Sequence, residues 1–220
     1  MAKMTPSPQT APAIRYRIRP ADPHAHLFAV ELQVDDPDPA GQRFALPAWI
    51  PGSYMIREFS RHIVRIEGRA GARRVALEKV DKHTWQAARC RGPLTLSYHV
   101  YAWDLSVRGA HLDASHGFFN GTGVFLRVLG RDKEPCAVEI LRPEGDDYSD
   151  WRVATTLPRA GARAWDFGGH RAADYDELID HPVEMGRFKL VEFDAVGVPH
   201  ALAVTGQHDA DTERISRDLR

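Results

Sequence analysis

The sequence predicts a mainly β protein, an antiparallel β-sandwich or saddle of about ten short strands with little helix. Three observations lead to this prediction. Apolar and polar residues alternate with a period of two in many short segments, which is typical of half-buried strands. Turn-forming residues separate these segments at intervals of roughly 8–12 residues, as in antiparallel all-β folds. Segments with helical periodicity are few and short.

Residues 14–207 are expected to form one β-rich domain. The segment LTLSYHVYAW (94–103) shows the alternation most clearly, because Leu94, Leu96, Tyr98 and Val100 stand at every second position. The segment 42–50 stops at Pro51-Gly52, a pair that breaks strands. The expected strands and hairpins, in chain order, are 26–34, 42–50, 62–70, a hairpin within 73–87, 94–103, a pair formed by 123–130 and 135–143, 151–157, and a hairpin within 186–206 that turns at 195–199.

Helix signals are confined to two segments. Residues 172–180 favour a short turn of helix. In residues 209–220, Asp211 or Thr212 is a suitable N-cap, and two apolar residues four apart would share one helix face. We expect 208–220 to be the start of a helical domain that is truncated in this chain.

The composition fits one large domain or two small ones and excludes several classes of partner. The chain has 220 residues, of which 43% are hydrophobic and 27% are charged. Its formal net charge of −1 offers no bulk attraction for nucleic acid or an anionic membrane. No apolar run approaches the roughly 18 residues that a membrane span needs. We therefore expect neither nucleic acid nor membrane as a partner.

The N-terminus and the cysteines indicate the cellular compartment in which the protein resides. Residues 1–13 are expected to form a disordered tail, and they lack the apolar segment of a secretory signal. Cys90 and Cys136 are too few for a disulfide framework and are interpreted as free thiols. The sequence thus predicts a cytoplasmic protein.

The standard catalytic motifs are absent from the sequence. It has no H-E-x-x-H helix, C-x-x-C pair, G-x-S-x-G elbow, P-loop or glycine-rich dinucleotide fingerprint. His111, Asp113 and His116 are spaced by two and three residues, which fits no standard set of metal ligands well. We interpret them as hydrogen-bonding loop residues and expect no metal ion in this chain. A small metalloenzyme built on these three residues is the weaker alternative.

Three further features have simple structural interpretations. Asn120-Gly121-Thr122 is formally a glycosylation acceptor, but Asn-Gly also favours a tight hairpin turn. Asp180 and Glu184 are either a pair of acid–base carboxylates or simply a helix end and a strand edge. The five tryptophans are expected to pack in the core rather than bind a ligand. They are Trp49, Trp85, Trp103, Trp151 and Trp165.

Six ordered segments carry a resemblance to a known family. They are PAWIPGSYMIREFSRHI (47–63), DKHTW (81–85), YHVYAWDLSVRGAHLD (98–113), GFFNGTGVFL (117–126), VATTL (153–157) and YDELIDHPVEMG (175–186). Together they resemble the amino-terminal domain of the glycyl-aminopeptidase-type zinc metallopeptidases, peptidase family M61. The resemblance implies a β-rich domain that precedes a thermolysin-like helical domain, and such proteins typically also carry a PDZ domain.

The resemblance also implies where the chemistry lies. In such proteins the H-E-x-x-H zinc site, a further glutamate ligand and a Gly-Gly-Leu-Glu-His-type element that recognises the substrate amine belong to the helical domain. None of these motifs occurs in this sequence. We therefore assign no catalytic residue and expect zinc only in the missing catalytic domain. This chain would be a non-catalytic wall of the cleft in which small N-terminal residues, glycine or alanine, are removed from peptides.

Polar residues after strand breaks are the candidates for that cleft or for the interdomain surface. Arg57 has a planar fork suited to a peptide carboxylate or carbonyl, and Tyr54 has a hydroxyl suited to an oxyanion. Otherwise Arg57 and Glu58 form a structural pair. Asp104 and Arg108 would pair with each other or with the missing domain.

Glu184 would attract a substrate ammonium group or form an interdomain salt bridge. The full set of candidates is Tyr54, Arg57, Glu58, Asp104, Arg108, Asn120, Asp180 and Glu184. The expected partners are the missing catalytic domain and, in the intact enzyme, the peptide substrate. The alternative is a stand-alone β-sandwich module that binds a peptide or a protein and has no enzymatic activity. Both hypotheses predict an exposed apolar patch larger than several hundred Å².

Overall fold

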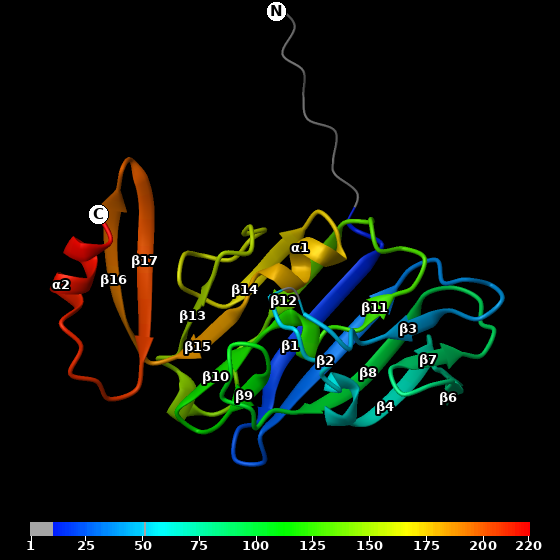
Figure 1. Cartoon of the computed structure of the whole chain (residues 1–220). Helices are drawn as coiled ribbons and strands as arrows, with labels where there is room; N and C mark the ends of the chain where they lie inside the picture. Colours follow the sequence, from blue (N-terminus) through cyan, green and yellow to red (C-terminus); the bar gives the residue numbers. More distant parts are fainter. Residues whose placement is uncertain (1–10, 51) are drawn as a thin grey trace, which may run out of the picture.

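The structure is mainly β, as the sequence predicts, and its sheets are mostly antiparallel (Figure 1). The computed structural model describes residues 11–50 and 52–220, so most of the predicted tail lies outside the described residues. Within them, there are seventeen strand segments, compared with the ten or so expected. Five lie where no strand was predicted, at 14–22, 110–112, 116–119, 168–172 and 183–186, and residues 73–79 form two strands in place of one hairpin arm.

The largest sheet has seven strands. They are β1 (Ile14–Asp22), β2 (Leu27–Val34), β4 (Ile63–Ala70), β5 (Arg73–Val75), β8 (Leu94–Tyr101), β12 (Cys136–Ile140) and β14 (Gly168–Ala172). Their order across the sheet is β14-β12-β1-β2-β8-β4-β5, and only β1 and β12 run parallel. Buried and less buried residues alternate along β1, β2 and β8. One face of this sheet therefore lies in the core and the other faces solvent.

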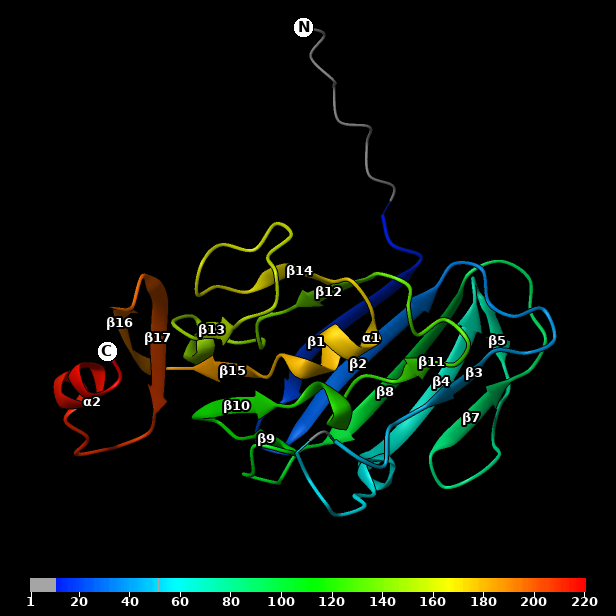
Figure 2. The same ribbon diagram turned by 45° about the horizontal axis from the view of Figure 1, so that its top comes forward.

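Two smaller sheets cover the buried face (Figure 2). One has the order β13-β15-β10-β9 and the other β11-β3-β7-β6. Their strands are β3 (Arg43–Ala45), β6 (Leu77–Lys79), β7 (Thr84–Ala87), β9 (Ala110–Leu112), β10 (His116–Phe119), β11 (Arg127–Val128), β13 (Arg152–Thr155) and β15 (Val183–Gly186). The layers meet through aromatic rings, such as Phe28 of β2 and Phe119 of β10, whose centroids are 5.6 Å apart.

A buried irregular segment, 124–126, is held by three tyrosines. The hydroxyls of Tyr16, Tyr98 and Tyr175 donate to its three carbonyls at 2.7–2.8 Å. Burial raises the pKa of each of these hydroxyls, so they remain protonated donors. Because an unpaired buried carbonyl is costly, these bonds fix the backbone at the centre of the domain.

The predicted hairpin turn at Asn120-Gly121 is wrong. Residues 121–123 form a 3-10 turn, η2 (Gly121–Gly123), and the Asn120 side chain caps it by accepting from the Thr122 N–H at 3.1 Å and its hydroxyl at 2.6 Å. Gly121 is needed for a different reason from the expected one. A Cβ there would lie 2.8 Å from the Cα of Ile179, because helix α1 (Tyr175–Asp180) packs against η2.

Strand pairing also departs from the prediction in the middle of the chain. The segments 123–130 and 135–143 do not pair with each other. Residues 127–128 form β11, which pairs with β3, while β12 lies parallel to β1. The expected strand 42–50 is reduced to β3 at 43–45. A pattern of alternation identifies strands but carries no information about distant partners, so the long-range pairings were missed.

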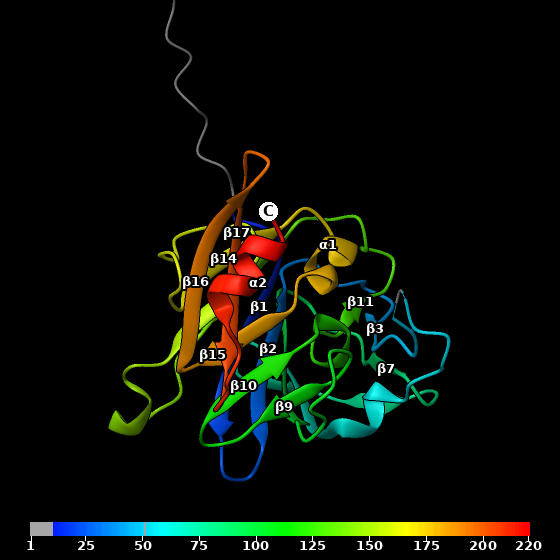
Figure 3. The same ribbon diagram turned by 60° about the vertical axis from the view of Figure 1, so that its left-hand side comes forward.

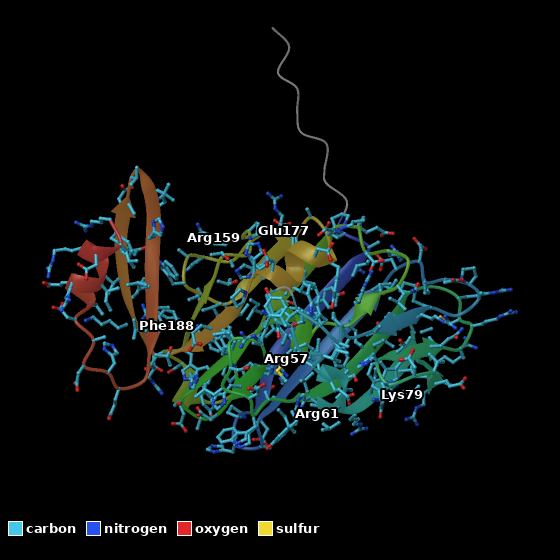
Figure 4. The ribbon with its side chains drawn as sticks, viewed as in Figure 1. Arg57, Arg61, Lys79, Arg159, Glu177 and Phe188 are labelled. Atoms are coloured by element: carbon cyan, nitrogen blue, oxygen red, sulfur yellow. The ribbon has the colours of Figure 1, made fainter. Side chains whose placement is uncertain are left out.

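The C-terminal hairpin forms where the sequence predicts it and makes a separate two-stranded sheet (Figure 3). β16 (Phe188–Ala195) and β17 (Val198–Thr205) are joined at residues 196–197. Helix α2 (Thr212–Asp218) begins after Asp211, one of the two predicted N-caps, and packs against β16. Figure 4 labels Phe188, which lies where β15 passes into the hairpin. No helix in the described part of the chain is long and apolar enough to cross a membrane.

Candidate functional site

The signature loop, residues 47–58, leads from β3 to the 3-10 turn η1 (Phe59–His62). A backbone bond from the Arg57 N–H to the Ala48 carbonyl, 2.6 Å, closes the loop at its base. The large exposed side chains of this loop are those of Trp49, Tyr54, Met55 and Ile56.

A second loop, residues 103–107, also exposes large apolar side chains. It follows β8 and is tied to β9 by a bond from the Asp104 N–H to the Ala110 carbonyl, 2.9 Å. The absence of a side chain at Gly109 leaves space for the Asp104 carboxylate, since a Cβ there would lie 2.5 Å from Oδ2. The exposed side chains are those of Trp103, Leu105 and Val107.

Both loops border one cleft of about 660 Å³, which we call the polar cleft. Three predicted candidates line it together, namely Arg108, Asn120 and Asp180. The remaining lining residues are Ile50, Gly52, Val107, Asp176, Glu177 and Ile179. In Figure 4, Arg57 of the signature loop lies below helix α1, on which Glu177 is labelled. Of the seven large exposed apolar side chains in the two loops, Val107 lines the cleft itself, together with an arginine, an amide and carboxylates.

The ion pairs proposed from sequence are replaced by others. Arg57 and Glu58 do not pair: Glu58 accepts from the Lys82 ammonium at 3.0 Å, and Arg57 Nε lies 3.5 Å from the Ser53 hydroxyl. Among the described residues Asp104 and Arg108 form no ion pair with each other.

Two further candidates, Tyr54 and Glu184, do not line the polar cleft. The Tyr54 side chain is fully exposed at the tip of the signature loop. Glu184 lies on β15, away from the polar cleft that Asp180 lines, so the two carboxylates do not form one acid–base pair. Its Oε1 accepts from the Thr205 hydroxyl of β17 at 2.7 Å, which links the small sheet to the C-terminal hairpin.

Burial raises the pKa of Glu184 to about 7, which the bond from Thr205 opposes and the nearby charge of Asp113 reinforces. Its cross-strand neighbours, Phe118 and Ala154, are uncharged. Within the described part of the chain no cation pairs with Glu184. This carboxyl group is therefore partly protonated near neutral pH.

Glu184→Gln is expected to change the pH dependence of stability. Because the folded-state pKa lies above the ordinary value of 4.5, the folded protein holds this proton more tightly than the unfolded chain. The contribution of this proton to the free energy of unfolding is fully present below about pH 4.5 and is lost as the pH rises through about 7. Between pH 5 and pH 8 the variant should lose roughly 2 kcal/mol less of its free energy of unfolding than the wild type.

Urea unfolding at the two pH values measures this difference. Glu78 is exposed and supplies a matched control, since Glu78→Gln should retain the wild-type pH dependence. If the wild type and Glu184→Gln lost equal amounts of their free energy of unfolding between the two pH values, the environment of Glu184 would not be the one described.

A third group of side chains lies on β9 and β10. His111 Nε2 is 3.2 Å from Asp113 Oδ2, and His116 Nδ1 is 3.6 Å from Asp113 Oδ1. The Trp103 and His111 ring centroids are 4.9 Å apart, and those of His111 and His116 are 4.8 Å apart. The His26 ring also lies against Trp103, with centroids 3.9 Å apart and an interplanar angle of 34°. Burial alone would raise the pKa of Asp113, but hydrogen bonds, chiefly from the adjacent turn, hold it well below its usual range.

A family model for the peptidase M61 N-terminal domain matches residues 15–187. The chain belongs to this family. The match ends immediately before β16, so the C-terminal hairpin and α2 follow the matched region. The resemblance inferred from the six sequence segments is confirmed at this level.

Solved structures similar to this M61 N-terminal domain include larger peptidases. The aminopeptidase N family protein from Idiomarina loihiensis is 43% identical with a TM-score of 0.90, and the match covers 94% of this chain and 35% of that one. The M1 zinc metallopeptidase E323A mutant from Deinococcus radiodurans is 10% identical with a TM-score of 0.49, covering 93% and 50%. Native yeast LTA4 hydrolase is 7% identical with a TM-score of 0.41, covering 85% and 32%. No curated protein matches the chain.

The sequence predicted exposed apolar surface but did not identify which residues of this M61 domain are exposed. The sequence placed all five tryptophans in the core, and this is correct for Trp85 and Trp151 but wrong for Trp49 and Trp103, which are each 54% exposed. Residues 103–107 alternate like a strand, so periodicity alone could not show that they form a loop. The clustering of Pro51, Gly52 and Gly109 around these segments was the available signal for loops.

Proposed function

We propose that this domain is the non-catalytic N-terminal domain of a zinc metallo-aminopeptidase and forms one wall of its substrate cleft. The observation that carries the proposal is the exposure of seven large apolar side chains in two loops beside the polar cleft. Large apolar side chains that are exposed in loops beside a cleft are typical of binding interfaces. The chain spans 35% of the similar aminopeptidase N family protein, and we propose that the catalytic domain occupies this surface.

The polar cleft supplies groups for a peptide substrate or for the facing domain. Arg108 has a guanidinium that makes no ion pair within the described residues and can bind a carboxylate or carbonyl with two donors. Asn120 uses its side-chain oxygen for Thr122, which leaves its amide hydrogens for another acceptor. Asp180 adds a carboxylate to the lining of the cleft. We propose that this wall helps to position peptides that begin with glycine or alanine.

The residues present do not fit the zinc site that the family implies. Such a site needs two histidines four apart on one helix, and neither α1 nor α2 contains a histidine. No step of peptide hydrolysis is therefore assigned to this chain. We propose that the zinc and a PDZ domain belong to other parts of the polypeptide. The two free cysteines support a cytoplasmic location.

Peptidase assays on two proteins test the proposal. The 220-residue chain and the full-length polypeptide are compared on glycyl, alanyl and leucyl aminopeptidase substrates. We expect no turnover by the chain, and turnover by the full-length enzyme with a preference for glycyl and alanyl substrates. A full-length polypeptide that is itself inactive would overturn the proposal and favour a stand-alone binding module.

A further inference from the structure

We propose that His111, Asp113 and His116 bind one divalent first-row transition-metal ion of the Zn²⁺ type. The sequence favoured simple hydrogen bonding at these positions, but the fold brings them closer than their spacing suggested. β9 and β10 are antiparallel neighbours, and a short turn carrying Asp113 joins them. One ligand atom from each of the three residues lies within 4.8 Å of the other two.

The Asp113 carboxylate is already oriented for this role. Its Oδ1 accepts three hydrogen bonds from the turn: from the Ser115 N–H at 2.7 Å, from the Ser115 hydroxyl at 2.6 Å and from the His116 N–H at 3.0 Å. Its Oδ2 contacts only His111 Nε2, at 3.2 Å. Hydrogen bonds to the outer oxygen of a ligating carboxylate are the usual support of a metal site. Oδ2 is thereby left to coordinate.

The distances suit a metal with bonds of about 2.0–2.2 Å, which places neighbouring ligand atoms roughly 3–3.5 Å apart. The separation of His111 Nε2 and Asp113 Oδ2 already lies in this range. The His116 ring must rotate to approach, which exchanges the present contact of its Nδ1 with the Ser115 hydroxyl, 3.2 Å, for the metal. Two imidazole nitrogens and one carboxylate oxygen favour Zn²⁺, Ni²⁺ or Cu²⁺ over Mg²⁺ or Ca²⁺, which prefer oxygen ligands.

The surroundings of His111 determine how tightly the metal ion is expected to bind. Its side chain is 6% exposed, and its Nδ1 is buried without a hydrogen-bond partner among the described residues. Coordination through Nε2 places the ring proton on Nδ1, where no acceptor supports it. Loss of such outer support typically weakens metal binding by about 10–100-fold. We therefore expect a dissociation constant in the micromolar range, with water completing the coordination.

Trp103 provides a spectroscopic signal for the site. Its ring is stacked on that of His111 with an interplanar angle of 29°, and it is half-exposed. A paramagnetic ion bound to His111 would quench the fluorescence of Trp103 at this distance, whereas the buried Trp151 lies in the core. Calorimetry can thus measure whether an ion binds, and the quenching of Trp103 can show where it binds.

Titration of the untagged 220-residue chain tests the proposal. Calorimetry with Zn²⁺ should show one site per chain, and Ni²⁺ should quench part of the tryptophan fluorescence. His116→Ala should weaken both effects at least tenfold, whereas His24→Ala, at an exposed histidine, should change neither. Trp103→Phe should retain the Zn²⁺ heat and lose most of the quenching.

Several results would overturn the proposal. The wild-type chain is measured first, so a stoichiometry near zero, or a dissociation constant above a millimolar, is decisive whether or not the variants fold. Wild-type affinity in a folded His116→Ala variant would also reject the site. Zn²⁺ binding that is insensitive to His116 but lost in His24→Ala would assign the ion to the exposed surface instead.

Discussion

A full-length enzyme that carries Leu105→Asp is expected to lose at least about 100-fold in kcat/KM on glycyl and alanyl substrates. Leu105 is 73% exposed in the chain described here, so a charge at this position should leave the fold of the domain intact. In the intact enzyme, the same side chain is proposed to lie against the catalytic domain. A carboxylate that is desolvated there without a partner costs several kcal/mol, which corresponds to a loss of this size.

Val80 supplies a matched control for this substitution. It is exposed, lies between β6 and β7 and belongs to neither loop, so Val80→Asp should leave kcat/KM unchanged. The isolated domain with Leu105→Asp should unfold at the same urea concentration as the wild type. Full activity of the Leu105→Asp enzyme would mean that the 103–107 loop does not meet the catalytic domain.

Arg108→Ala in the full-length enzyme is expected to lower kcat/KM about tenfold or more, since a lost charge-assisted hydrogen bond costs roughly 1.5–3 kcal/mol. Arg108 lines the polar cleft beside Asn120 and has no carboxylate partner within the described residues. Its removal should therefore cost function rather than folding. Arg108→Lys should restore little, because a single ammonium cannot replace two parallel donors.

The control for Arg108 is Arg91, an exposed arginine in a distant loop. Arg91→Ala should keep the wild-type kinetics. If Arg108→Ala kept them as well, while remaining correctly folded, the guanidinium would be removed from the list of cleft residues.

Local structure was predicted well wherever a segment carried its own pattern. The alternation in 26–34 and 94–103 identified β2 and β8, and the acidic segment 172–180 identified α1. The hairpin around 195–199 was recognised from two alternating segments around a turn. These elements depend on residues close in sequence, which is the information that periodicity contains.

The arrangement of the site depends on distant contacts, and the sequence could not supply it. Asn120 was placed in a hairpin turn, but the packing of Ile179 against Gly121 made it the cap of a 3-10 turn. Glu58 was given its neighbour Arg57 as a partner, whereas Lys82 reaches it across the fold. Only the folded chain shows that Arg108, Asn120 and Asp180 share one cleft. The family resemblance identified the sequence segments that carry these residues, but it did not show which segments lie together in the fold.

The exposure of the signature loop in the intact enzyme tests the central proposal most directly. Hydrogen–deuterium exchange is compared between the 220-residue chain and the full-length enzyme for residues 49–56 and 103–107, with the exposed residues Arg91 and Gly92 as an internal reference. If the catalytic domain covers both loops, their amides should exchange at least tenfold more slowly in the full-length enzyme, while those of Arg91 and Gly92 exchange equally in both proteins. Equal exchange of both loops in the two proteins would contradict the proposed interface.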